Sequence, residues 1–267
     1  MLFENPYLEP DLLHNNGLYS TTGYANIYHA DRSYQVRRLT SEDENRNAEY
    51  QKLRTEIFVN LLDWSIPVDH QGREKDQYDT GLSSAVTIHG VYDYDSQQQK
   101  YSLLGGIRIH EITTWSETML WNEFQQANML PPDIRRKIQA KYDPLLTLEL
   151  TRFCTRKSAG RGKAFDLSVA RDYTYASVYA YAERLGRPYA LALVHRPYFL
   201  VLKRLHFIFE TLYTHFEACN KTEKYAIVMI HLPETIRSFH AFQQETRAYR
   251  MMALCSRQSW MYNFKEE

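Results

Sequence analysis

The sequence predicts an α/β fold of the α+β sandwich type, in which a mixed, mostly antiparallel twisted sheet is flanked by helices. Two observations carry this prediction. The first half of the chain combines a helix with antiparallel strands, and the second half alternates strand, helix, strand, helix and strand. The chain has 267 residues without a long Pro-, Gly- or Ser-rich linker, which favours one domain with additions.

The first half supplies a short strand, a helix and a hairpin. Residues 33–38 alternate in polarity as a strand does. Residues 40–44 place Ser and Thr before acids, which is typical of a capping box that begins a helix, and apolar residues then recur at helical spacing as far as Leu61. Residues 84–94 and 101–110 are two strands separated by a polar turn, so they predict an antiparallel hairpin.

The second half alternates strands and helices. The strand at 145–153 reads LLTLELTRF, and the long helix that follows must end at Gly186 and Pro188. The expected elements are helices at 118–126, 131–140, 164–185, 197–205 and 234–255, and strands at 145–153, 189–194, 207–213 and 225–232. This order divides the chain into an N-terminal arm at 1–31, a main domain at 32–233 and a C-terminal helical extension at 234–267.

Composition and charge exclude several classes of protein. Lys plus Arg and Asp plus Glu both number 32, so no global charge directs the chain to nucleic acid or to an anionic membrane. The three Cys lack metal-site spacing, their odd number favours a reducing compartment, and the ten His form no HExxH motif. With neither a signal peptide nor a membrane-length apolar run, the expectation is a soluble cytoplasmic protein without a metal.

Glu149 is the first candidate for chemistry. Alternation along its strand places Glu149 and Thr151 on one side and Leu148, Leu150 and Arg152 on the other. Burial would favour the neutral form of this carboxyl group unless a cation paired with it, which suits a general base near neutral pH. The alternative is an edge-strand Glu that faces water.

A second group of candidates lies on the first helix and in the charged loop after it. Arg54 and Phe58 are four residues apart and share a helical face. Asp76 and Asp79 could pair bidentately with Arg54 or Arg108 and so shape the wall of a pocket. The plainer interpretations are a surface Arg and a solvated loop, which is the usual fate of a charge run.

Residues 157–162 form a basic, Gly-containing loop between the predicted strand at 145–153 and the helix at 164–185. Backbone N–H groups at such a helix start attract phosphate, and Lys157 and Arg161 add positive charge. A simple turn is the plainer interpretation. The strand, loop and helix resemble the core of GNAT-type acyltransferases, and the loop resembles the pyrophosphate loop of CoA-dependent acetyltransferases.

Taken together, these residues resemble the acyl-homoserine-lactone synthase family, the autoinducer synthases of bacterial quorum sensing. Each piece alone is common, but their order and spacing over roughly residues 32–232 are specific. The matching pieces are Arg54, Phe58 and Trp64; Asp76 and Asp79; Gly105 to Arg108; Met119, Leu120 and Phe124; and Glu149, Thr151 and Arg152.

The chain departs from the family pattern in two places. The family usually carries Leu-Pro-Thr after its Gly-x-x-Arg strand, whereas residues 109–113 here read Ile-His-Glu-Ile-Thr. Val194 and His195 stand where the family often has Thr or Ser. These departures leave the acyl-chain preference open.

The resemblance implies a GNAT-like fold and an N-acyltransferase that makes N-acyl-homoserine lactones. Its substrates would be S-adenosylmethionine, which is not a cofactor here, and an acyl chain on acyl carrier protein or, less often, on CoA. The amine of S-adenosylmethionine would attack the thioester, and lactone closure would release methylthioadenosine.

The resemblance also implies roles for individual residues. Glu149 would be the base, acting through a water, and Thr151 would belong to the substrate-binding set. The S-adenosylmethionine pocket would comprise Arg54, Trp64, Asp76, Asp79 and Arg108. The acyl slot would be lined or braced by Phe58, Phe124 and Arg152. The dock for an acidic carrier protein would comprise Arg156, Lys157, Arg161, Lys163, Lys203 and Arg204.

Two other functions remain compatible with the sequence. One is a GNAT-like N-acyltransferase that uses acyl-CoA on another amine, which the loop at 157–162 favours and the Arg54, Asp76 and Asp79 set does not. The other is a degenerate homologue that only binds a ligand or a partner. Retention of every acid and Arg in the set counts against it.

Overall fold

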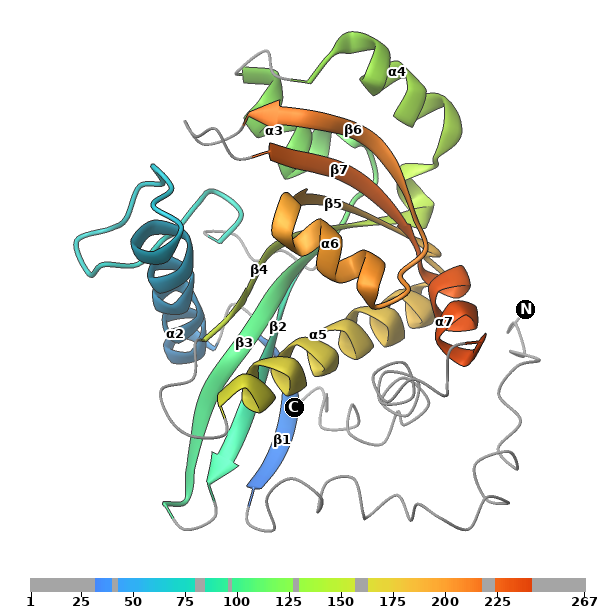
Figure 1. The fold of residues 1–267 in the computed structure, drawn as a ribbon. Coiled ribbons are helices and arrows are strands. Elements are labelled where there is room, and N and C mark those ends of the chain that lie inside the picture. Colours follow the sequence, from blue (N-terminus) through green and yellow to red (C-terminus); the bar gives the residue numbers. More distant parts are fainter. Residues whose placement is uncertain are drawn as a thin grey trace.

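The computed structural model describes residues 32–39, 43–79, 85–95, 98–126, 130–156, 163–217 and 224–241. Their centre is a seven-stranded sheet in the order β1-β2-β3-β4-β5-β7-β6 (Figure 1). The strands are β1 Arg32–Leu39, β2 Val86–Asp95, β3 Lys100–Glu111, β4 Thr147–Thr155, β5 Tyr189–His195, β6 Phe209–Glu217 and β7 Lys224–His231.

The sheet is antiparallel except at its centre, where β4 and β5 run parallel. Their pairing joins Thr147–Leu150 to Tyr189–Ala192, although both strands continue further. Beyond Leu150 and Ala192 the two strands diverge (Figure 1). The outer part of β4 remains paired with β3, so the sheet opens between its two halves.

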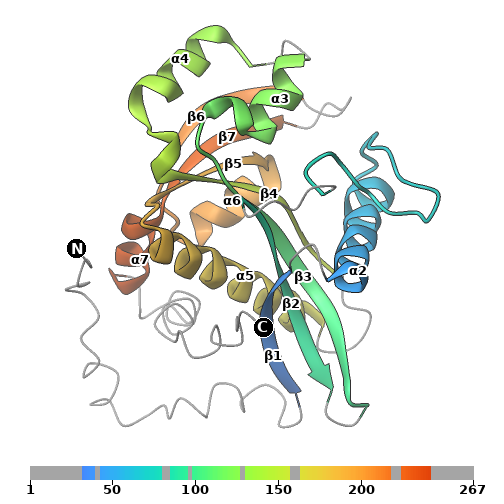
Figure 2. The ribbon, with the colours of Figure 1, turned by 180° about the vertical axis from the view of Figure 1, so that it is seen from behind.

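Helices cover both faces of the sheet (Figures 1 and 2). The helices are α2 Glu44–Arg54, α3 Met119–Gln126, α4 Pro132–Lys141, α5 Lys163–Leu185, α6 Arg196–Arg204 and α7 Leu232–Ala241, with a π-helix at Thr55–Leu61 and 3₁₀ turns at Trp115–Glu117 and Pro144–Leu146. Helix α5 packs on β2, β3 and β4, and α2 packs on β3 and β4 from the opposite face.

Alternation along β3, together with a bulge in this strand, places its apolar side chains in two cores on opposite faces of the sheet. Ile107 and Ile109 face α5, where they pack with Val178 and Tyr181. Leu103 belongs instead to the core beneath α2, on the other side of the bulge in β3. The polar side chains that interrupt this second core lie where β3 and β4 meet the loop after the π-helix, and they form the candidate site.

The predicted sandwich with a mixed, mostly antiparallel sheet is confirmed, and most expected elements are present. The first helix begins at Glu44 and changes to π geometry at Thr55, so the predicted helix to Leu61 is not a regular α-helix. The predicted strand at 207–213 is found at Phe209–Glu217. The C-terminal helix begins at Leu232 and is described as far as Ala241.

Several sequence predictions lie outside the described residues. These are the arm at 1–31, the loop at 157–162 and the rest of the C-terminal extension after Ala241. Within the part of the chain that the structure covers, no helix combines the length and the apolar character needed to cross a membrane.

Candidate functional site

The floor of the site is one face of the paired strands β3 and β4. Arg108 lies directly opposite Thr151 in the register, and His110 lies opposite Glu149. Nε of Arg108 donates a hydrogen bond of 2.9 Å to Oγ1 of Thr151. The Gly-x-x-Arg and Glu-x-Thr-Arg segments therefore form two halves of one surface.

Arg152 also lies on this face, so the prediction that it points to the opposite side was wrong. The β3–β4 register shifts between Gly106 and Arg108, and Arg152 has a φ of 54°. This β-bulge inserts an extra residue and turns the side chain around, which simple alternation cannot anticipate. Arg152 then reaches Oε1 of Glu74 at 3.2 Å and Oδ2 of Asp76 at 3.3 Å.

Arg54 is fully buried at the end of α2, where the helix changes to π geometry. Its guanidinium pairs with Glu74 and donates a 2.8 Å hydrogen bond to Oδ1 of Asp79. Burial alone would lower the pKa of Arg54, but the two carboxylates outweigh burial and raise it. The interpretation of Arg54 as a surface residue is therefore wrong.

Asp76 joins the remaining cations. Its Oδ1 accepts a 2.7 Å hydrogen bond from Nη1 of Arg108, and its Oδ2 accepts one from Arg152. Burial would raise the pKa of Asp76, but Arg108, Arg152 and Arg54 together lower it to about 2. The carboxylate is therefore held ionised, and the loop that carries it is not merely solvated.

Three guanidinium groups and three carboxylates thus form one cluster, which we call the charge lattice. Its members are Arg54, Arg108, Arg152, Glu74, Asp76 and Asp79. Opposite charges are equal in number, so each buried ion has a partner, which is the condition for tolerating charge in a low-dielectric site. Asp76 has the most exposed side chain of the six, at 17%.

Glu149 is buried and does not face water at a strand edge. Its Oε2 accepts a 2.7 Å hydrogen bond from the backbone N–H of Met119, and its Oε1 accepts one of 2.8 Å from that of Leu120. These N–H groups are free of intrahelical partners because they begin α3, and the helix dipole adds to the attraction for a carboxylate. Glu149 therefore anchors α3 to the sheet.

Met119 has a second role at this junction. Its Sδ lies 2.9 Å from Nη2 of Arg108, so the start of α3 contacts both Glu149 and the charge lattice. The Met-Leu pair of the sequence motif therefore contributes backbone N–H groups as well as apolar surface. For Phe124, five residues after Met119 on α3, only the backbone is described.

Aromatic side chains extend from the charge lattice toward the opening in the sheet. The rings of Phe58 and Trp64 are stacked with centroids 4.9 Å apart, and Arg152 lies 6.0 Å from the centroid of Phe58. Trp64 meets the edge of Tyr225 at 5.8 Å, and the ring of Tyr225 lies 6.4 Å from that of His195. The predicted acyl-slot and pocket-wall residues Phe58 and Trp64 are thus neighbours.

Tyr50 and Glu74 belong to the site although sequence reasoning did not assign them. Tyr50 lies one helical turn before Arg54, and its hydroxyl donates a 2.5 Å hydrogen bond to the carbonyl of Arg152. A Cβ on Gly106 would lie 2.9 Å from both the Tyr50 ring and the backbone oxygen of His89, which accounts for a Gly two residues before Arg108. Glu74 carried a signal as well, since it is an acid two residues before Asp76.

The predicted carrier dock is described only in part. Arg156 follows β4, and its side chain is 39% exposed with Nε 3.7 Å from a carboxylate oxygen of Glu56. Lys203 and Arg204 are exposed in the last turn of α6. Lys157 and Arg161 lie outside the described residues, and only the backbone of Lys163 is described. The dock stays a prediction.

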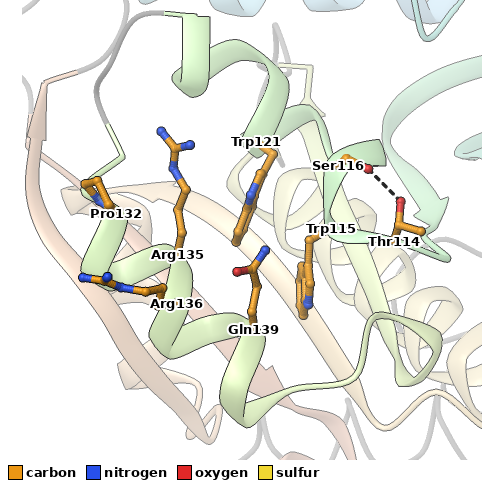
Figure 3. A pocket seen from close by; sticks show the side chains of 8 residues that line it. All are labelled: Thr114, Trp115, Ser116, Trp121, Pro132, Arg135, Arg136 and Gln139. Atoms are coloured by element: carbon orange, nitrogen blue, oxygen red, sulfur yellow. Dashed lines mark hydrogen bonds between the residues drawn. The ribbon is translucent and has the colours of Figure 1, made fainter.

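A separate pocket of about 540 Å³ lies between α4 and the segment that precedes α3 (Figure 3). Trp115 and Trp121 are stacked on one side of it with ring centroids 5.4 Å apart. Its lining residues are Thr114, Trp115, Ser116, Trp121, Pro132, Arg135, Arg136 and Gln139. None of them belongs to the charge lattice, so this pocket is distinct from the candidate site.

The chain matches a known protein family over most of its length. The model of the autoinducer synthase family matches residues 38–239, which include every member of the charge lattice and Glu149. No curated protein sequence matches the chain significantly.

Three solved structures illustrate the similarity in fold. The acyl-homoserine-lactone synthase LasI has a TM-score of 0.55 and 19% identity, covering 75% of this chain and 90% of its own. The CoA-dependent synthase BjaI, solved with S-adenosylmethionine and isopentyl-CoA, has a TM-score of 0.54 and 16% identity, and the match covers 79% of this chain and 89% of BjaI. FeeM, an N-acyl amino acid synthase from uncultured soil microbes, has a TM-score of 0.51 and 14% identity, and the match covers 78% of this chain and 95% of FeeM.

The match of the family model over most of the chain identifies the family, and the mixed sheet agrees with its GNAT-like fold. The chain therefore belongs to the autoinducer synthase family of acyltransferases, which make acyl-homoserine lactones.

Proposed function

We propose that this protein makes an N-acyl-homoserine lactone from S-adenosylmethionine and an acyl thioester, and that it releases methylthioadenosine. The observation that carries the proposal is the position of Glu149 on the same β3–β4 face as the charge lattice. The family match supports the reaction class. The BjaI structure with S-adenosylmethionine and isopentyl-CoA, and the TofI structure with an inhibitor and methylthioadenosine, support the choice of substrate.

The charge lattice forms the wall of the S-adenosylmethionine pocket in this proposal. Arg54 and Asp79 are too deeply buried to meet a ligand directly, so they hold the loop in place. Asp76 is the most accessible carboxylate and faces the cationic substrate. Trp64 adds a ring near the sulfonium, where cation–π attraction contributes about 0.5–2 kcal/mol.

The reaction has two steps with different needs. The α-ammonium of S-adenosylmethionine loses a proton, and the amine attacks the thioester carbonyl to form the amide and expel the thiol. Proton removal depends on Glu149. The substrate carboxylate then attacks the carbon beside the sulfonium, so a C–O bond forms while the C–S bond breaks and methylthioadenosine leaves.

The acyl donor approaches from the opening between β4 and β5. The aromatic series from Phe58 and Trp64 supports an apolar path there, with Thr151 and Arg152 bracing its inner end. An acidic carrier protein would dock on the exposed basic residues Arg156, Lys203 and Arg204, together with the undescribed Lys157, Arg161 and Lys163. Acyl-CoA is the other donor, and BjaI provides the precedent.

The test is product analysis with purified protein. Incubation with S-adenosylmethionine and either acyl carrier protein thioesters or acyl-CoAs is expected to release methylthioadenosine and to form an acyl-homoserine lactone, measured by mass spectrometry. The parent mass gives the acyl chain. Absence of both products from every donor, while thermal shift confirms a folded protein, would reject the proposal.

A second candidate is an N-acyltransferase that acylates an amino acid without forming a lactone. The likeness to FeeM, of which this fold covers 95%, favours it. The two functions differ in one product, because only lactone formation releases methylthioadenosine. An acyl amino acid formed without methylthioadenosine would select this alternative.

A further inference from the structure

His110 lies beside Glu149 at a position where the chain departs from the expected motif. The two residues are direct cross-strand partners in the antiparallel β3–β4 pair. Nδ1 of His110 is 3.5 Å from Oε2 of Glu149. This Nδ1 is buried and has no hydrogen-bond partner among the described residues, while 11% of the His110 side chain remains exposed. An imidazole with one nitrogen toward a carboxylate and a partly open surface has the geometry of an oriented base.

Glu149 itself is poorly placed to take a proton alone. Each of its oxygens already accepts a backbone N–H from the start of α3, through Met119 and Leu120. A carboxylate has about four lone-pair positions, so two remain, and one side of Oε2 faces His110. The side chain is also almost completely buried. The two amides fix its orientation and leave it suited to holding an imidazole N–H.

We propose that Glu149 and His110 form a dyad, in which His110 accepts the proton of the substrate ammonium and Glu149 positions the imidazole. Neutral His110 would carry its hydrogen on Nδ1, directed at Oε2, and present the lone pair of Nε2 to the substrate. The 3.5 Å separation is long for a hydrogen bond, and catalytic hydrogen bonds commonly shorten when substrate is bound. This inference rests on the proposed function and changes the role of Glu149 from acceptor to positioning residue.

The proton inventory of the amide-forming step balances. Nε2 takes one proton from the α-ammonium, which leaves a neutral amine whose lone pair attacks the thioester carbon. When the tetrahedral intermediate collapses, the electron pair of the C–S bond leaves with sulfur, and the imidazolium protonates the thiolate. The second amine proton passes to solvent, so the step releases one proton overall and His110 returns to its neutral form.

The groups around His110 are compatible with this role. The Tyr78 ring lies 6.1 Å from the imidazole, and Arg108 is two residues away on the same strand face. Glu117, in the 3₁₀ turn before α3, interacts electrostatically with His110 and with the backbone N–H of Thr113. His110 thus faces the carboxylates of Glu149 and Glu117, the cation of Arg108 and one phenol.

The experiment compares His110→Gln and His110→Ala with the wild-type protein, using methylthioadenosine release as the assay. We expect kcat to fall by about 10²-fold or more while the KM for S-adenosylmethionine changes little, because the imidazole acts in proton transfer. In His110→Gln, the acid limb of the pH–rate profile should lose the ionisation of the imidazole. Added imidazole should restore part of the rate of His110→Ala.

Two further variants separate catalysis from packing. In the His110→Ala background, Glu149→Gln should cost much less than it does alone, since both residues serve one function. His70→Gln, an exposed His of the loop, should keep the wild-type rate. A kcat within twofold of wild type for His110→Gln would overturn the dyad. The dyad would also be overturned if the loss of rate accompanied a lower thermal midpoint and added imidazole did not restore it.

Failure of the proposed function looks different. If the wild-type protein releases no methylthioadenosine with any donor, the lactone synthase proposal fails and the dyad fails with it. If the wild-type protein is active and the His110 variants are equally active, only the dyad fails.

Discussion

Oδ1 of Asp76 accepts a 2.7 Å hydrogen bond from Nη1 of Arg108, although the two residues are 32 positions apart. Asp76 comes from the loop after the π-helix, and Arg108 comes from strand β3. This contact closes the charge lattice over the β3–β4 face. It means that substitutions in the lattice affect both the stability of the fold and the shape of the proposed pocket, and the two effects can be measured separately.

Glu149→Gln tests the role of the Glu149 carboxylate in proton removal. We expect methylthioadenosine release to fall by about 10²–10⁴-fold, because the amide can neither accept the substrate proton nor hold the His110 imidazole as a carboxylate does. One amide oxygen can still accept an N–H of α3, so the variant should fold. Glu44→Gln, at an exposed position in the first turn of α2, is the matched control. A near-wild-type rate for Glu149→Gln would contradict the assignment.

Glu74→Gln tests the buried part of the charge lattice. Glu74 is fully buried between Arg54 and Arg152, and removal of its charge leaves a buried guanidinium without full compensation. Breaking such a pair costs about 3–5 kcal/mol of unfolding free energy. Chemical denaturation measures the loss.

Asp69→Asn is the control for Glu74→Gln, because it removes a carboxylate that pairs with Arg73 at the surface. Its unfolding midpoint should stay close to that of the wild-type protein. Equal losses of unfolding free energy in the two variants would contradict the prediction that the buried charge lattice stabilises the fold more than a surface ion pair does.

The lowered pKa of Asp76 predicts an acid-dependent loss of stability. Arg108 and Arg152, acting against the effect of burial, bring this pKa from 3.8 to about 2 in the folded state. The contribution of Asp76 is therefore fully present above pH 4 and is lost as the pH falls through about 2. Unfolding free energies of wild type and Asp76→Asn, measured from pH 5 to pH 2, should converge toward the acid end. A constant difference across this range would contradict the prediction.

Lys203→Glu combined with Arg204→Glu tests docking of an acidic carrier protein. Both residues are exposed in the last turn of α6, so reversing their charges should not disturb the core. The KM for an acyl carrier protein thioester should rise steeply at low salt and much less at high salt, because salt screens exposed charges.

Two comparisons control the docking experiment. Lys52→Glu changes an exposed Lys on α2 and should leave the carrier KM unchanged. The KM for acyl-CoA should also be less affected than that for the carrier. An unchanged carrier KM in the double variant would remove α6 from the docking surface.

The local patterns of the sequence were sufficient for the element types and for most of the site. Asp76 and Asp79 were predicted to be able to pair bidentately with Arg54 or Arg108, with a solvated loop as the plainer interpretation, and the structure brings these residues together. Glu149 was singled out because a carboxylate within an apolar strand is unusual.

Contacts between distant segments were beyond the reach of local patterns. Arg152 lies on the site face only because the β3–β4 register contains a bulge, and a bulge depends on both strands at once. Glu74 looked like one more acid in a charged loop until Arg54 and Arg152 were seen on either side of it. The position of His110 opposite Glu149 depends on the same register.

The sequence by itself determined the mixed sheet, the family and the residue types that the site requires, since periodicity and motif spacing are written along the chain. The tertiary structure alone decided how these residues are joined. It tied Glu149 to the start of α3, turned Arg152 toward Asp76 and set His110 beside Glu149. The physical reason is that strand register, bulges and buried charge pairing are properties of two or more segments packed together, and no single segment carries them.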